Sequence, residues 1–255
     1  MLRASVSGQD YPILERNKDD EELSRAAESL ERSSPQDILR WAVDVYGRDL
    51  ALSVSFGNSE GMVLLDMLSR ITDEAQVFTL DTGFLFEETI RFREEAMKRY
   101  PLPLKVVTPG LTIDEQVARY GPKLYSCKPD LCCEIRKIEP QRRFLRDYSA
   151  WVTGIRREQT EQRASTPVLS WEERFGVVKI APLVNLSAEE VEEYVCERSI
   201  PRNPLLGRGY KSIGCAPCTQ PVSEDGDARA GRWPGMDKTE CGLHFMGGAV
   251  KRANP

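Results

Sequence analysis

The stretch LALSVSFGNSEGMVLLDML, residues 50–68, decides the fold of this chain. Its apolar start at residues 50–54 predicts a buried strand, and the apolar periodicity after Glu60 predicts a helix. A loop from strand to helix presents backbone N–H groups and the positive end of a helix, which attract phosphate. The loop lacks the Gly-Lys-Ser/Thr of a Walker A motif, so a P-loop lysine is not expected. We expect a nucleotide here, with an ordinary turn as the alternative.

Short apolar runs alternate with helical segments along the rest of the chain. The other expected strands are residues 77–80, 104–107, 151–153 and 177–180. The expected helices are residues 60–69, 87–100, 132–148 and 187–197. Ser187 with Glu190 forms a capping box for the last helix. We therefore expect an α/β fold with a doubly wound, mostly parallel sheet and helices on both faces.

We expect one α/β domain, residues 49–218, with a segment on each side of it. Residues 1–48 are predicted to be an N-terminal helical segment packed on the core, with Ser34 as an N-cap before Pro35. Residues 219–255 are predicted to be a flexible C-terminal tail, because glycine, proline and charge are frequent from residue 201 onward. Three of the seven cysteines lie after residue 201, which favours a functional tail over an idle one.

Composition excludes several classes of protein. Hydrophobic residues make up 40% and charged residues 29% of the 255, as in ordinary globular proteins. The net charge of −5 argues against a nucleic-acid surface, which needs clustered Lys and Arg in excess. The apolar runs are too short to cross a bilayer, and the first twenty residues lack the apolar core of a signal peptide. We expect a cytoplasmic protein that binds neither nucleic acid nor membrane.

Two cysteine pairs suggest a metal centre. Cys132 and Cys133 are adjacent, and Cys215 and Cys218 form a CxxC motif. In a reducing compartment such pairs favour metal binding or redox chemistry over disulfides. Four thiolates suit zinc or an iron-sulfur cluster. Adjacent cysteines would strain one tetrahedral zinc, whereas in a cubane each binds a different iron, so we rank the cluster ahead of zinc and four unrelated thiols last.

Three further cysteines are single. Cys241, in ECGLH beside the only histidine, is a candidate nucleophile, with a fifth metal ligand as the alternative. Cys196 falls in an apolar-periodic helix and is expected in the core, while Cys127 is a bystander.

Polar and basic groups follow other predicted strands. Asp81, Thr82 and Gly83 end the second strand and would line the same crevice as the first loop, with Asp81 as a helix cap being the alternative. Arginine forks suit phosphate or sulfate oxygens, and solvated surface arginine is the alternative for each. The candidates are Arg156, Arg157, Arg163, Arg229 and Arg232. Lys137 lies four residues after Cys133, on the same helical face, where a solvated lysine is the alternative.

Taken together, the CC pair, CxxC, WVTGIRREQ and ECGLH, in this order between about Leu50 and His244, resemble the assimilatory adenylylsulfate and phosphoadenylylsulfate reductases. The closest branch is the iron-sulfur branch that uses adenosine 5'-phosphosulfate (APS). The resemblance implies an adenine-nucleotide alpha-hydrolase-like fold, in which SFGNSEG cradles a sulfonucleotide.

The resemblance also implies roles for residues. A 4Fe-4S cluster is expected on Cys132, Cys133, Cys215 and Cys218, with Lys137 between cluster and substrate and Cys241 as the nucleophile. Arg163, Arg229 and Arg232 match the family's sulfate- and phosphate-binding arginines, and Arg156 or Arg157 could replace Arg163. The full set of expected substrate contacts is Ser55, Phe56, Gly57, Leu80, Asp81, Thr82, Gly83, Lys137, Gly154, Arg156, Arg163, Arg229, Arg232 and His244.

The activity that the resemblance implies is reduction of APS to sulfite and AMP in sulfate assimilation, through an S-sulfocysteine on Cys241 that thioredoxin or a similar dithiol reduces. Use of the 3'-phosphorylated substrate, or of both, is the main alternative. A tRNA thiolation enzyme would want SGGxDS in place of SFGNSEG and a basic surface, and a non-catalytic iron-sulfur sensor would need no tail thiol. The sequence does not fix the oligomeric state, and a homo-oligomer is compatible with it.

Overall fold

The computed structural model describes residues 20–223, 225–227, 229–236, 238, 240 and 242–244. Within these residues six strands form one sheet in the order β3-β2-β1-β4-β6-β5. The strands are β1 (Leu50–Ser53), β2 (Gln76–Leu80), β3 (Leu104–Val107), β4 (Ala150–Val152), β5 (Leu169–Glu172) and β6 (Val177–Ile180). All neighbours pair in parallel except β5, which is antiparallel to β6. The chain therefore reverses direction across the sheet at β1, between β2 and β4, and the prediction of a mostly parallel sheet is confirmed.

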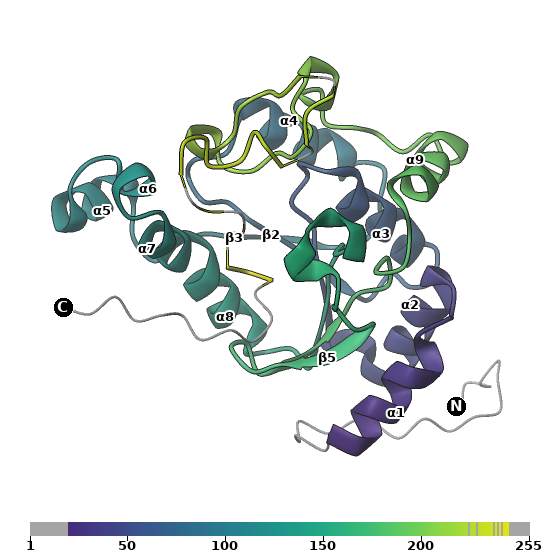
Figure 1. Cartoon of the computed structure of the whole chain (residues 1–255). Coiled ribbons are helices and arrows are strands. Elements are labelled where there is room, and N and C mark those ends of the chain that lie inside the picture. The colour runs from purple at the N-terminus through teal and green to yellow at the C-terminus, as the bar shows by residue number, and fades with distance from the viewer. Residues whose placement is uncertain are drawn as a thin grey trace.

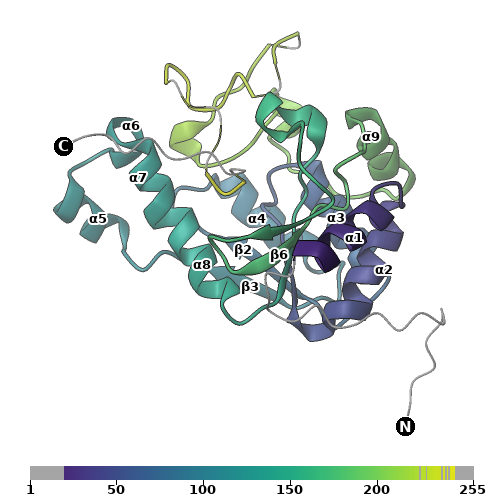
Figure 2. The same cartoon turned by 60° about the horizontal axis from the view of Figure 1, so that its bottom comes forward.

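The two faces of the sheet carry separate cores because side chains alternate along each strand. Leu50 and Leu52 lie in one core, whereas Ala51 between them lies in the other. The first core includes residues of α1 (Asp20–Leu30), α2 (Pro35–Tyr46), α3 (Ser59–Ser69), α4 (Glu87–Ala96) and α9 (Ala188–Glu197). The second is closed by a helical arm that runs into α8 (Glu139–Leu145), on the opposite side of the sheet from α2 and α3 (Figures 1 and 2).

The arm consists of α5 (Ile113–Tyr120), α6 (Leu124–Cys127), α7 (Pro129–Cys133), a π-helical turn (Glu134–Ile138) and α8. The helix expected over residues 132–148 thus begins earlier and widens in its middle. Glu139 N–H donates to the carbonyl of Glu134, five residues back, and Pro140 has no N–H to restore the ordinary α-helical bond there. Such π turns occur frequently at functional sites.

Local capping signals are confirmed. Ser34 caps α2 by accepting from the N–H of Asp37, and Ser187 and Glu190 form the expected capping box at α9. The α2 side chains pack in the same core as β1. The domain boundaries at residues 48 and 218 stay a prediction. The remaining helical pieces are 3₁₀ turns at Gly47–Asp49, Arg157–Gln159, Glu161–Arg163, Leu206–Arg208 and Ala216–Cys218.

Two features differ from expectation. The strand β5 was not expected, because LSWE has no apolar run; its partner β6 recruits it through a short turn at Gly176, whose φ of +66° suits glycine. Cys196 is exposed, not in the core, because Val195 beside it takes the inward position on α9.

Among the helices described, none is both long enough and apolar enough to cross a membrane.

Candidate functional site

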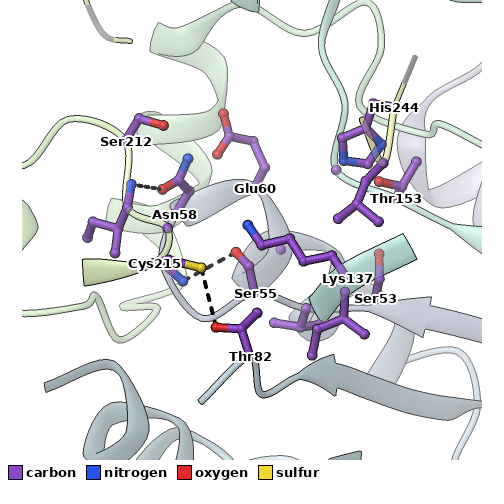
Figure 3. Close-up of a pocket in the computed structure, with 18 of the residues that line it drawn as sticks. Ser53, Ser55, Asn58, Glu60, Thr82, Lys137, Thr153, Ser212, Cys215 and His244 are labelled. Atoms are coloured by element: carbon purple, nitrogen blue, oxygen red, sulfur yellow. Dashed lines mark hydrogen bonds between the residues drawn. The ribbon is translucent and has the colours of Figure 1, made fainter. Parts of the chain in front are cut away.

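A pocket of about 200 Å³ opens at the carboxyl ends of β1, β2 and β4. This is the point where the strand order reverses, which is where doubly wound folds bind their ligands. Residues at the end of these three strands or just after them line it: Ser55, Gly57, Asn58, Leu80, Thr82, Thr153 and Gly154. Figure 3 shows Asn58 and Ser212 on one side of the pocket and Thr153 and His244 on the other.

The loop after β1 is held from outside by the segment before the CxxC motif. Asn203 Nδ2 donates to the carbonyl of Phe56 at 2.9 Å, and Ile213 N–H donates to Asn58 Oδ1 at 3.0 Å. Gly57 packs against Ile213 so closely that a Cβ would lie 2.8 Å from its carbonyl oxygen. Phe56 itself is buried at a φ of +54°, a conformation unusual for a non-glycine residue. The backbone of the loop is therefore fixed before any ligand binds.

The arginines after β4 have different partners. Arg156 donates to Glu60 at 3.1 Å and does not line the pocket, whereas Glu60 does. Arg157 is turned toward Glu31, with Nη2 donating to Oε2 at 3.2 Å. Arg163 does line the pocket. Of the three alternatives, the structure therefore brings only Arg163 to this site.

Two further arginines and a lysine line the pocket. Arg232 lies against Gly214, where a Cβ would come within 2.3 Å of its Nη2, and its guanidinium sits 4.5 Å from the centre of the Trp233 ring. Arg229 and Lys137 complete the basic lining. Lys137 comes from the π turn after the cysteine pair. The pocket can accordingly hold an anion whose charge is spread over several oxygens.

A second cavity adjoins the first and is lined by both cysteine pairs. Cys132, Cys133, Cys215 and Cys218 are buried free thiols. Lys137, Cys215 and Arg232 line both cavities. Thr82 Oγ1 lies 3.3 Å from Cys215 Sγ, which joins the loop after β2 to the CxxC motif (Figure 3). Lys137 thus lines both cavities, and its predicted place between a cluster and a substrate stays a prediction.

The four thiols can be tested as ligands. Burial, with the nearby Cys215 and Cys218 sulfurs, raises the pKa of Cys132 to about 11, and burial likewise raises the pKa of Cys218. Among the described side chains, no group of three or more His, Cys, Asp or Glu is placed to hold one metal ion. The four thiols line one cavity but do not converge on one point. Thiols are soft ligands, so this arrangement suits a group large enough to bind each sulfur separately.

The described residues on either side of Cys241 lie at or beside the pocket. Cys241 lies outside the described residues, but Glu240 before it and residues 242–244 after it are described. Leu243 and His244 line the pocket, and the His244 ring stacks on Trp151 with centroids 5.6 Å apart. Burial lowers the pKa of His244 well below its ordinary value. Neighbouring cations reinforce this, namely Arg163, Lys179, Arg174 and Arg229.

Most of the expected substrate contacts line the pocket: Ser55, Gly57, Leu80, Thr82, Lys137, Gly154, Arg163, Arg229, Arg232 and His244. Phe56, Asp81, Gly83 and Arg156 do not. Asp81 instead accepts from Gly83 N–H at 3.0 Å and pairs with Arg93 at 3.5 Å. Its carboxylate thus shapes the turn before α4 but does not cap that helix, whose N-cap is Phe86, so the capping alternative is wrong.

Sequence reasoning missed several lining residues outside the SFGNSEG loop, among them Ser53, Gln141, Trp151, Gln159, Ser212 and Ile213. Gln141 follows Lys137 by four residues on the arm, so helical spacing was an available signal for it. Ser212 and Ile213 directly precede the CxxC motif. Gln159 Nε2 donates to Glu60 Oε1 at 2.9 Å across 99 residues, and the sequence carries no local signal for this contact.

The fold and site define a class: a doubly wound α/β protein with a basic pocket suited to an anion beside four buried thiols. Comparison with known proteins narrows the class. Residues 49–221 match the model of the phosphoadenosine phosphosulfate reductase domain, and the chain belongs to this family. The resemblance inferred from its motifs is confirmed.

Individual relatives cover most of the chain. An adenosine 5'-phosphosulfate reductase of Streptomyces coelicolor is 46% identical over 86% of this chain and 92% of its own length. A phosphoadenosine 5'-phosphosulfate reductase of Gloeobacter violaceus is 43% identical over 92% and 98%.

Solved structures agree with this assignment. The phosphoadenylyl-sulfate reductase of Candida auris, a phosphate complex, superposes with a TM-score of 0.70 at 31% identity, over 81% of this chain and 98% of that one. An FMN adenylyltransferase of Candida glabrata, at 14% identity and a TM-score of 0.58, shares the fold alone. The expected adenine-nucleotide alpha-hydrolase-like fold is confirmed.

Proposed function

We propose that this protein reduces adenosine 5'-phosphosulfate to sulfite and AMP in cytoplasmic sulfate assimilation. The observation that carries the proposal is the pair of adjoining cavities, one at the nucleotide edge of the sheet and one lined by four cysteines, with Lys137, Cys215 and Arg232 common to both. Relatives named for this reduction, at 43–46% identity over most of their length, support the choice of substrate.

In the first proposed step, the Cys241 thiolate attacks the sulfur of the bound substrate. A sulfur–sulfur bond forms, the bond from sulfur to the bridging phosphate oxygen breaks, and AMP leaves with that electron pair. Lys137, Arg229 and Arg232 line the pocket, where their charges would offset the negative charge that gathers as the thiolate approaches. The product is an S-sulfocysteine on Cys241.

In the second proposed step, a thiolate of thioredoxin or a similar dithiol attacks the Cys241 sulfur and releases sulfite. The second thiol of the reductant then attacks the mixed disulfide, which frees Cys241 and leaves the reductant as a disulfide. The dithiol supplies both electrons. A 4Fe-4S cluster held by Cys132, Cys133, Cys215 and Cys218 would supply charge beside the substrate without carrying these electrons.

Mass measurement tests the nucleophile. Wild-type protein incubated with the substrate but no reductant should gain one sulfonate group on the peptide that contains Cys241. The Cys241→Ser variant should gain none while still binding AMP in calorimetry. Cys196→Ser is the matched control, since Cys196 is exposed on α9 and should leave the adduct unchanged. Substantial reductase activity in Cys241→Ser would remove Cys241 from this role.

Metal analysis tests the cofactor separately. Cys133→Ser should lose iron and acid-labile sulfide together with activity, because its buried thiol lines the shared cavity. Purified wild-type protein that carries stoichiometric zinc and no iron would contradict the cluster.

The second candidate function is reduction of the 3'-phosphorylated substrate, since the Gloeobacter violaceus relative is named for it. Parallel kinetics with the two sulfonucleotides decide between single and dual use. A kcat/KM that favours the 3'-phosphorylated form would reverse the assignment.

A further inference from the structure

Glu240, the residue before Cys241, is buried in an ion pair at the pocket. Its two carboxylate oxygens accept from Arg163 Nε at 2.9 Å and Nη2 at 2.8 Å, the parallel geometry in which arginine binds carboxylates best. Arg229 Nη2 donates to the same carboxylate at 3.1 Å, and Thr160 Oγ1 at 3.3 Å. Only 5% of the Glu240 side chain is exposed. A glutamate in a tail segment could have remained in water, so its burial here requires a specific partner.

Arg163 gives all three of its side-chain nitrogens to the protein. Nε and Nη2 bond Glu240, and Nη1 donates to Gln159, which is itself bonded to Glu60 at 2.9 Å. The guanidinium is therefore oriented by the loop after β4 and directed at the tail. These contacts use three of the five N–H donors of the guanidinium, among them the parallel pair on Nε and Nη2 that would bind a substrate anion best.

The chain after Cys241 is held by a second arginine. Arg174, in the turn between β5 and β6, donates to the carbonyls of Gly242 and Leu243, the latter at 3.1 Å. Its own Nε donates to Glu172 at 2.8 Å. The residues on both sides of Cys241 are thus fixed by arginines from two different loops.

We propose that Glu240 is a positioning residue, which anchors the tail over the pocket through Arg163 so that the adjacent Cys241 meets the substrate. Arg163 then serves the tail, Arg232 and Lys137 bind the sulfonucleotide, and Arg229, which donates to Glu240 and also lines the pocket, contacts both. The inference rests on the proposed role of Cys241, but the anchoring itself is measurable without turnover.

The experiment compares Glu240→Gln, Arg163→Gln and the double variant. Gln keeps the length of Glu240 but removes the charge that both arginines bind. Arg157→Gln is the matched control, because Arg157 lies in the same loop and pairs with Glu31, away from the pocket. Circular dichroism and iron content confirm that each variant is folded and loaded.

Two readouts separate anchoring from substrate binding. Hydrogen exchange of the Gly242 and Leu243 amides should accelerate roughly tenfold or more in both single variants, the effect of losing a charged hydrogen bond. The double variant should add little, because the two residues act as one unit. The single-turnover rate of sulfonate transfer should fall in the same variants in which exchange of the tail accelerates. The affinity for APS, measured in the Cys241→Ser background, should change less than about threefold.

Two results would overturn the proposal. Unchanged exchange of the tail in Glu240→Gln and Arg163→Gln would show that the pair does not hold it. A large loss of APS affinity in Arg163→Gln but not in Glu240→Gln would make Arg163 a substrate ligand. Failure of the proposed function looks different: the wild-type protein would gain no sulfonate, whatever the tail does.

Discussion

A buried lysine at the edge of the site allows a quantitative prediction of stability. Lys179 lies on β6, 1% exposed, with its Nζ 3.9 Å from Glu172 and no hydrogen-bond partner for Nζ among the described residues. Burial lowers the pKa of Lys179 from 10.5 to about 8, although Glu172 opposes the change, while Arg174 and Arg163 add to it. The folded protein therefore disfavours the charged form that the unfolded chain prefers.

Replacing Lys179 with Met should stabilise the protein. The difference between 10.5 and about 8, at about 1.4 kcal/mol for each pH unit, corresponds to about 3 kcal/mol at pH 7. Between these two values the unfolded chain binds more protons, so the wild-type protein gains stability as the pH rises. The advantage of Lys179→Met should thus be full below pH 8 and fall below about 0.5 kcal/mol at pH 10.5.

Urea unfolding at several pH values measures this difference. Lys98→Met, at an exposed position in the turn after α4, is the control and should change stability little at any pH. A Lys179→Met variant that is less stable than wild type at pH 7 would refute the reasoning, because the charge would then be a net stabilising group. A gain that persists unchanged to pH 10.5 would refute its electrostatic origin.

Three further predictions concern the tail and the loops. Burial and nearby cations lower the pKa of His244, so the ring is neutral while the tail is docked. Acidification below its ordinary pKa of 6.5 should therefore raise the equilibrium constant for release of the tail by up to about tenfold per pH unit. Hydrogen exchange of Leu243 measures this release, and persistence of the pH dependence in His244→Phe would contradict the prediction. Gly214→Ala should displace Arg232 and slow sulfonate transfer with iron content unchanged. The control is Gly207→Ala, which has nothing within 4 Å of the added Cβ and should leave the transfer rate unchanged. Equal transfer rates in the two variants would show that Arg232 is dispensable. Ser34→Ala should lower thermal stability by about 1 kcal/mol through loss of the α2 cap, and no change in calorimetry would mean that the cap contributes nothing.

Most of the sheet could be predicted from the sequence because its signals are local. Apolar runs of three to five residues marked five of the six strands, and Ser187 with Glu190 marked a helix start within one turn. The strand β5 has no such run, and its pairing with β6 supplies what its own sequence lacks. The π turn also escaped prediction, because Pro140 lacks an N–H but does not by itself specify that Glu139 bonds the carbonyl of Glu134.

The cysteine pairs and ECGLH were enough by themselves to propose the chemistry of this chain, because the suitability of a thiol as ligand or nucleophile is a property of the side chain. Only the tertiary structure decided which charged groups meet. Arg163 and Glu240 lie 77 residues apart, and the sequence gives no reason to prefer this pair over Arg156 or Arg157. The choice depends on where the chain returns after the CxxC motif. Ion pairs act over a few ångströms in space regardless of separation along the chain, so periodicity and spacing cannot reveal them.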